Sequence, residues 1–167
     1  MQETKQGFTL LEMIVVICLV GLIMTLGMMQ LSFLDATIAH AELDKLSTAC
    51  SFLQQHAIVT NNECVLMCNS EKNEYWCDKV YEKLSHQISF GTLPGAKGAP
   101  GSASHVIQKP ITFSDFQIHF YPTGIISSGT IYLIDKKKRF MYALSNAISQ
   151  VSYLRLYRYD GIWKLLK

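Results

Sequence analysis

The sequence predicts an α+β protein in which one long N-terminal helix packs on an antiparallel β-sheet domain. Residues 13–34 carry no charged side chain, and apolar residues then recur at helical spacing to about residue 60. Short strand-like segments follow as far as the C-terminus. The short connections between these segments favour antiparallel pairing, and a helix layered on a sheet buries the apolar faces of both.

The uncharged segment is long enough to cross a membrane. Its 22 residues, from Met13 to Leu34, would form a helix of roughly 33 Å, whereas the hydrocarbon core of a bilayer measures about 30 Å. We therefore expect a single transmembrane helix over residues 8–34.

The helix is predicted to continue beyond this segment, over residues 35–60, as an amphipathic half. Charged residues lie mainly outside its apolar stripe, and Asn61-Asn62 is expected to mark the helix end. The stripe has spacings of three and four, and consists of Leu43, Leu46, Cys50, Leu53 and Ala57.

A β-rich domain is expected over residues 61–167. A hairpin around Lys72-Asn73 would begin it, a glycine-rich loop would cover residues 91–104, and residues 135–138 would form a charged hairpin tip. The expected strands are residues 63–69, 74–80, 116–120, 130–134, 139–144, 151–159 and 162–166.

The cysteines predict disulfides in an oxidising compartment. Cys18 lies inside the uncharged segment and is expected to be a buried membrane thiol, whereas four cysteines follow between residues 50 and 77. A turn at Lys72-Asn73 would place Cys68 opposite Cys77, which leaves Cys50 for Cys64. Cys64 and Cys68 lie four residues apart on one expected strand, too far to bond with each other if that strand is extended. The remaining pairing stays open, as does a zinc site made by the same four thiolates.

Charge is distributed unevenly along the chain. The net charge is +2, but residues 34–90 hold eight acidic and four basic residues, and residues 105–167 hold three acidic and nine basic residues. The basic half could favour an anionic partner. Candidate nucleic-acid contacts are Lys136, Lys137, Lys138, Arg139, Arg155 and Arg158, with Tyr153, Tyr157 and Tyr159 interleaved for base stacking.

No catalytic constellation is visible in the sequence. The five histidines lack metalloprotease spacing, and no glycine loop of the phosphate-binding type occurs. We therefore predict neither an enzyme nor a bound cofactor or metal.

The residues before the uncharged segment carry a recognisable pattern. Residues 7–12 read Gly-Phe-Thr-Leu-Leu-Glu, which resembles the processing site of type IV pilins and type II secretion pseudopilins. The resemblance implies that prepilin peptidase removes residues 1–7 by cutting between Gly7 and Phe8, and that the new amine of Phe8 is N-methylated. The mature chain would then hold 167 − 7 = 160 residues.

The resemblance implies that Glu12 takes part in subunit assembly. A carboxylate within packed apolar helices needs a cation, and the Phe8 amine of a neighbouring subunit is the family's candidate. Two other interpretations compete: a secretory signal peptide cleaved after Ala39-His40-Ala41, and a plain signal anchor.

Three further stretches resemble the H-type minor pseudopilins and their FimT-like relatives (the GspH/FimT-like family). This resemblance implies a subunit of a type II secretion pseudopilus, anchored in the inner membrane with a periplasmic C-terminal domain. Its partners would be other pilins or pseudopilins, prepilin peptidase and the inner-membrane assembly platform. The alternative is a minor pilin of a type IV pilus or competence system that binds DNA. The first stretch, residues 51–58 with 61–62 and 65–66, resembles the family's helix end and first strand. The second, residues 120–124 with 128–131, resembles the hairpin between its middle strands. The third, residues 159–162, resembles its final turn.

Overall fold

The computed structural model describes residues 9–78, 80–99, 105–146 and 152–166, with backbone alone over residues 27–36. The chain divides into two compact units, Met1–Asp35 and Ala36–Lys167, which are described separately. Residues 1–7 of the predicted leader, and Phe8, lie outside the described residues.

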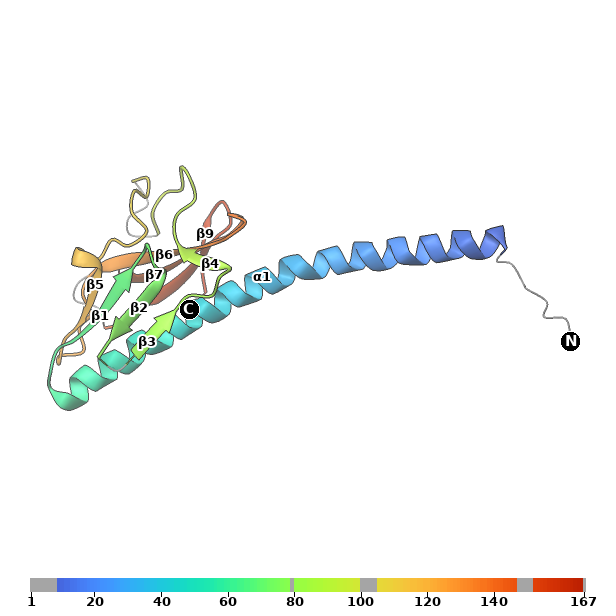
Figure 1. Ribbon diagram of the computed structural model, residues 1–167. Helices are drawn as coiled ribbons and strands as arrows, with labels where there is room; N and C mark the ends of the chain where they lie inside the picture. The colour runs from blue at the N-terminus through green and yellow to red at the C-terminus, as the bar shows by residue number, and fades with distance from the viewer. Residues whose placement is uncertain (1–8, 79, 100–104, 147–151, 167) are drawn as a thin grey trace, which may run out of the picture. The chain divides into compact units, whose positions relative to one another are not determined.

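One helix, α1 (Leu10–Thr60), accounts for the N-terminal part of the chain (Figure 1). It ends where Asn61 adopts a left-handed conformation with φ of 53°, a conformation that Asn tolerates and that commonly terminates helices. The predicted helix end at Asn61-Asn62 is therefore confirmed.

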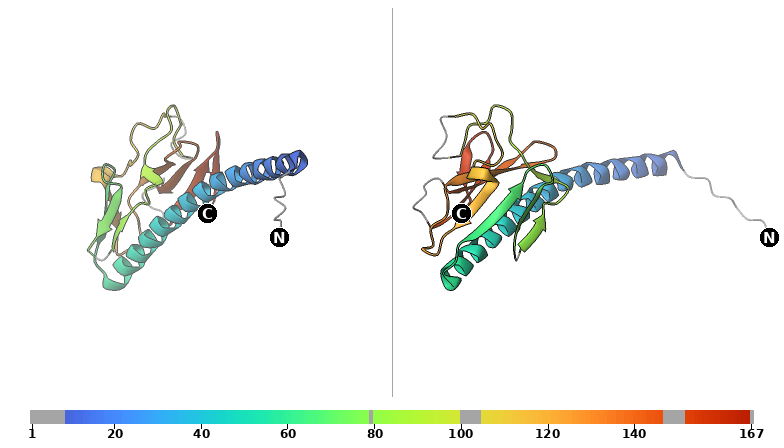
Figure 2. Two further views of the ribbon diagram at one scale, coloured as in Figure 1. Left: turned by 45° about the vertical axis from the view of Figure 1, so that its right-hand side comes forward. Right: turned by 60° about the vertical axis from the view of Figure 1, so that its left-hand side comes forward.

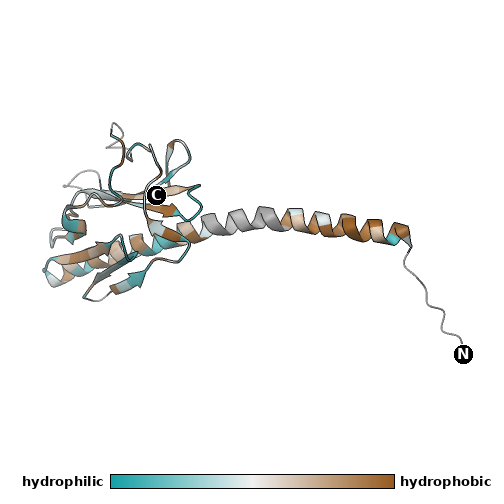
Figure 3. Ribbon diagram, turned by 45° about the horizontal axis from the view of Figure 1, so that its top comes forward, coloured by the Kyte–Doolittle hydropathy of each residue, from teal (hydrophilic) through white to brown (hydrophobic). Residues whose placement is uncertain are grey.

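The first unit presents apolar side chains to its surroundings. All side chains from Leu10 to Leu26 are exposed, and this part of α1 is mostly brown in Figure 3. Among the described helical residues, no stretch combines the length and the hydropathy required of a membrane span.

In the second unit, the predicted apolar stripe of α1 is buried, with each of its five side chains at most 2% exposed. Glu42 differs from the general expectation for charged residues, because only 7% of it is exposed. It precedes Leu46 by four residues and therefore lies at the edge of the buried stripe. Its carboxylate lies 3.5 Å from the ammonium of Lys45.

Two antiparallel sheets pack in this unit, where the sequence predicted one (Figure 2). Sheet A has the strand order β3-β2-β1-β5, and sheet B the order β4-β6-β7-β8-β9. The strands of sheet A are β1 (Cys64–Asn69), β2 (Glu74–Cys77), β3 (Val80–Lys83) and β5 (Gln117–Phe120). Those of sheet B are β4 (Ile88–Phe90), β6 (Gly129–Asp135), β7 (Met141–Asn146), β8 (Arg155–Tyr159) and β9 (Trp163–Leu165).

The turn after β5 carries the chain from one sheet to the other. Gly124 has φ of 81°, and its N–H donates to the carbonyl of Tyr121 at 2.8 Å, so a tight turn forms where one was expected. However, β5 pairs with β1 and β6 pairs with β7 and β4. The expected hairpin is confirmed at the turn itself, because Phe120 forms an antiparallel bridge with Ile126 and the Tyr121 N–H donates to the carbonyl of Ile125 at 2.9 Å. Beyond this short hairpin, β5 and β6 belong to different sheets and do not pair with each other.

The main core lies between α1 and both sheets. It joins the helix stripe to Leu66 and Ile118 of sheet A and to Leu133 and Leu144 of sheet B. A second cluster contains Tyr132, which alternation places on the opposite face of β6 from Leu133. Residues of the loop before β5, including Ala96 and Ala99, cover this second cluster.

Candidate functional site

The helix begins with a reciprocal pair of side-chain caps. The Glu12 N–H donates to the hydroxyl oxygen of Thr9 at 3.3 Å, and the Thr9 N–H donates to Glu12 Oε2 at 2.9 Å. The Thr9 hydroxyl also donates to Oε2 at 3.1 Å. This is the capping box of the pattern Thr-x-x-Glu, which supplies partners to N–H groups that the first helical turn leaves unbonded.

The capping box fixes where the Glu12 carboxylate lies. It sits at the positive end of the helix dipole and is exposed in the first unit. Both of its bonds to Thr9 use Oε2, so Oε1 remains accessible to a further donor. The predicted partner, the amine of Phe8, lies outside the described residues, as does Gly7, so the charge pair stays a prediction.

The β1–β2 hairpin has a different register from the expected one. Asn69 pairs with Glu74 and Cys68 pairs with Tyr75, because residues 70–73 form the connection. Cys68 is therefore not opposite Cys77, and that expectation is wrong. Continuing the register places Cys77 level with Leu66.

Cys64 and Cys77 line a cavity of about 550 Å³ beside the end of α1. His56 and Trp76 also form its wall, and His56 Nδ1 lies 3.5 Å from the sulfur of Cys64. Within the described residues, no three His, Cys, Asp or Glu side chains are arranged to hold a metal ion.

The predicted basic residues do not all share one surface: the guanidinium groups of Arg139 and Arg158 both stack on the ring of Phe140, at 5.5 and 4.6 Å, whereas Arg155 lies on the other face of sheet B. Lys136 to Lys138 occupy the turn between β6 and β7, as expected, whereas Arg139 lies with its Nε 3.4 Å from Asp135. Arg155 and Arg158 are three residues apart on β8, so they point to opposite faces of sheet B.

The three tyrosines proposed for base stacking do not form one exposed surface either. Tyr157 is 5% exposed and Tyr159 packs on Trp163, with ring centroids 5.0 Å apart, so both belong to the second core cluster. Tyr153 is exposed, and its hydroxyl accepts a hydrogen bond from Arg155 at 2.8 Å. DNA contact stays a prediction for the β6–β7 turn and the Tyr153–Arg155 pair.

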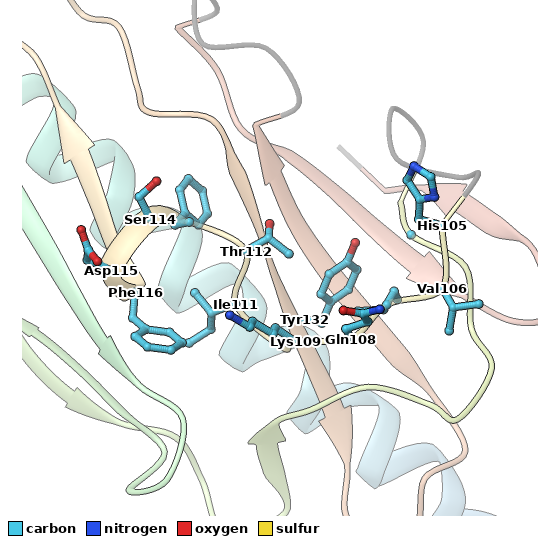
Figure 4. A pocket seen from close by; sticks show the side chains of 13 residues that line it. His105, Val106, Gln108, Lys109, Ile111, Thr112, Ser114, Asp115, Phe116 and Tyr132 are labelled. Carbon is cyan, nitrogen blue, oxygen red and sulfur yellow. The ribbon is translucent and has the colours of Figure 1, made fainter.

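A larger cavity, of about 770 Å³, lies along the segment that precedes β5. Gly98, residues 105–109 and 111–116, and Tyr132 line it. In Figure 4 the labelled polar side chains are spread along the segment from His105 to Asp115 and do not converge on one point. The cavity is therefore a depression in the surface, and the polar side chains that line it are not arranged for acid–base chemistry.

Two structural determinants were not singled out by the sequence. The capping box had a signal, the Thr9-x-x-Glu12 spacing, which the processing pattern overlaps. Gln54 had none: its amide donates to the carbonyls of Gly124 and Ser152, at 2.6 and 2.7 Å, and so ties α1 to two loops distant in sequence.

No protein-family model, no curated protein and no solved structure matches this chain.

Proposed function

We propose that the protein is a minor pseudopilin, a structural subunit of a type II secretion pseudopilus that prepilin peptidase processes. The observation that carries this proposal is the coincidence of Gly7, Phe8 and Glu12 with the uncharged segment that starts at Met13. Hydrophobic length alone would support only an anchor. A carboxylate at the start of such a helix is costly in lipid, and therefore needs a function.

The exposed apolar side chains of residues 10–26 provide the packing surface of the proposed subunit. In a bundle of such helices, the Glu12 carboxylate would pair with the Phe8 amine of a neighbouring subunit. A displaced subunit would leave both charges unpaired in a medium of low dielectric constant, which is strongly unfavourable. The charge pair would thus select one axial register while apolar contacts provide most of the attraction.

The unit Ala36–Lys167 would project into the periplasm and contact other pilins or cargo. Its helix half buries its apolar stripe against both sheets, so this half of α1 belongs to the folded domain. The two parts of α1 would therefore have different roles. The first part would anchor and assemble the subunit, whereas the second part is the central helix of the domain.

Processing gives the most accessible test of this proposal. We expect the chain purified from membranes of cells with prepilin peptidase to start at an N-methylated Phe8 and to contain 160 residues, 167 − 7. Intact-mass measurement and N-terminal sequencing read both features, and cells that lack the peptidase provide the control, with Met1 retained. A chain that keeps Met1 in the presence of the peptidase, or one that starts at Glu42, would contradict the proposal.

A further inference from the structure

Four cysteines of the second unit lie at the interface between α1 and sheet A. Cys64, Leu66 and Cys68 alternate along β1 and therefore point to the same face. Leu66 and Cys68 are buried in the main core, and Cys50 of α1 is buried in that core with 0% exposed. The face that carries Cys64 and Cys68 is thus the face that the helix covers.

The contact between His56 and Cys64 aligns the strand with the helix. Because those side chains are 3.5 Å apart, the start of β1 lies level with residue 56. After the turn at residues 61–63, β1 runs back beside α1 (Figure 2). From Cys64 to Cys68 the strand advances about 13 Å, and from residue 56 back to Cys50 the helix advances about 9 Å. The strand is inclined to the helix, so its advance along the helix axis is shorter than about 13 Å and Cys68 comes level with Cys50.

The ionisation of the two buried thiols agrees with this alignment. Burial raises the pKa of Cys68 to about 12. Burial also raises the pKa of Cys50, and the nearby charge of a Cys68 thiolate raises it further. Cys50 and Cys64 are poor partners by comparison, because Cys64 lies level with a residue more than one helical turn beyond Cys50.

Cys64 and Cys77 line the same cavity beside the end of α1, and the continued register places Cys77 level with Leu66, two residues from Cys64 on the same face of β1. Both are half-buried and both line that cavity, whereas Cys68 does not. On its other side Cys64 lies opposite Phe120, whose buried ring occupies that position. Cys68 has Tyr75 opposite it, with a ring that is only 1% exposed.

We propose that this chain forms two disulfides in an oxidising compartment, Cys50–Cys68 and Cys64–Cys77. The compartment rests on the proposed function, while the pairing rests on where the fold places the four residues, because Cys50 and Cys68 are not joined to each other in the structure. For each bridge, two cysteine thiols give two electrons and two protons to a disulfide donor of the thiol–disulfide oxidoreductase class, which is reduced to a dithiol. The first bridge would fasten α1 to sheet A, and the second would close the cavity wall.

The two bridges should differ in when they can form. Thiols with raised pKa and no access to solvent react slowly, so Cys50–Cys68 should form before the core closes. Cys64 faces a cavity and has an imidazole beside its sulfur, so it can still exchange after folding.

Mapping the cysteines of the full chain tests this pairing. The protein is extracted from membranes in detergent with excess alkylating reagent and no reductant, then digested and analysed by mass spectrometry without reduction. Cleavage after Glu63, Leu66 and Lys72 places Cys50, Cys64, Cys68 and Cys77 on four separate peptides. We expect Cys50 joined to Cys68, Cys64 joined to Cys77, and Cys18 alkylated. A bridge between Cys68 and Cys77 or between Cys50 and Cys64, or alkylation of all four residues, would overturn the proposal.

A pair of variants sharpens the result. In Cys68→Ala we expect Cys50 to be alkylated and the Cys64–Cys77 bridge to stay intact. If Cys68 were instead joined to Cys77, the same variant would leave Cys77 alkylated. Cys18→Ala is the matched control and should leave both bridges unchanged. The mature N-terminus, read from the same samples, keeps the two proposals separate: a Phe8 start with four alkylated cysteines overturns only the disulfides, and Met1 with both bridges present overturns only the proposed processing.

Discussion

Leu46→Ala should lower the free energy of unfolding of the unit Ala36–Lys167 by about 2–5 kcal/mol. Leu46 is fully buried at the centre of the stripe that joins α1 to both sheets, so the shorter side chain loses apolar burial and leaves a cavity. Urea unfolding of a chain that starts at Ala36, followed by circular dichroism, measures the change as a shift of the midpoint at constant slope.

Val59→Ala provides a control on the same helix. Val59 is 83% exposed, and alanine has the higher helix propensity, so this variant should unfold within about 0.5 kcal/mol of the parent. Equal losses in the two variants would contradict the assignment of residues 36–60 to the core, because they would show no dependence on burial.

Asp135→Ala should destabilise the same unit by about 2–4 kcal/mol. This carboxylate is 3% exposed and accepts N–H groups from Arg139 at 2.6 Å and Phe140 at 2.8 Å, which fixes the turn between β6 and β7. Alanine would leave both donors without that acceptor, and hydrogen bonds to charged groups are the stronger kind. The same urea titration reads the loss.

Asp160→Ala is the matched control for a turn carboxylate. Asp160 lies 3.4 Å from Lys164 in the β8–β9 turn, but more than half of each side chain is exposed. Exposed ion pairs contribute little to stability, so we expect Asp160→Ala to lower the free energy of unfolding by less than about 1 kcal/mol. If the two aspartate variants lost equal stability, burial and hydrogen bonding of Asp135 would not explain its effect.

The long helix and its buried stripe could be predicted because their signal is local. Residues at spacings of three and four from Leu43 to Ala57 share one helical face, whatever lies opposite. The charged turn at residues 135–138 and the final turn at Asp160-Gly161 likewise depend on adjacent residues. These features are present in the structure as β6–β7 and β8–β9 hairpins.

The division into two sheets could not be predicted, because it depends on distant pairings. β4 has three residues, and pairs with β6 through contacts such as Ile88 with Asp135. β3 has four residues and was missed because its polar composition carries no clear alternation. The register around Cys68 also depended on the length of one turn, where a difference of two residues changes every opposite pair.

The candidate assembly site was predicted in part. The pattern at residues 7–12 singled out Glu12, and the structure shows its carboxylate exposed at the helix start. The same pattern does not separate two roles of this side chain, capping the helix and pairing with a cation. These roles need different properties, because a neutral Gln can still cap a helix whereas only a charge can form an ion pair.

Glu12 therefore offers the most direct measurement of the central claim, that α1 is an anchor built for assembly. The amount of each variant in purified filaments is compared with its amount in the membrane fraction. We expect Glu12→Leu and Glu12→Gln to reach the membrane in normal amounts. Their ratio of filament to membrane protein should be at least tenfold lower than that of the parent, which corresponds to a loss of about 1.4 kcal/mol in the free energy of assembly. Thr9→Ala, which removes the cap and keeps the charge, should enter filaments nearly as well as the parent. Normal incorporation of Glu12→Gln and Glu12→Leu would contradict the account.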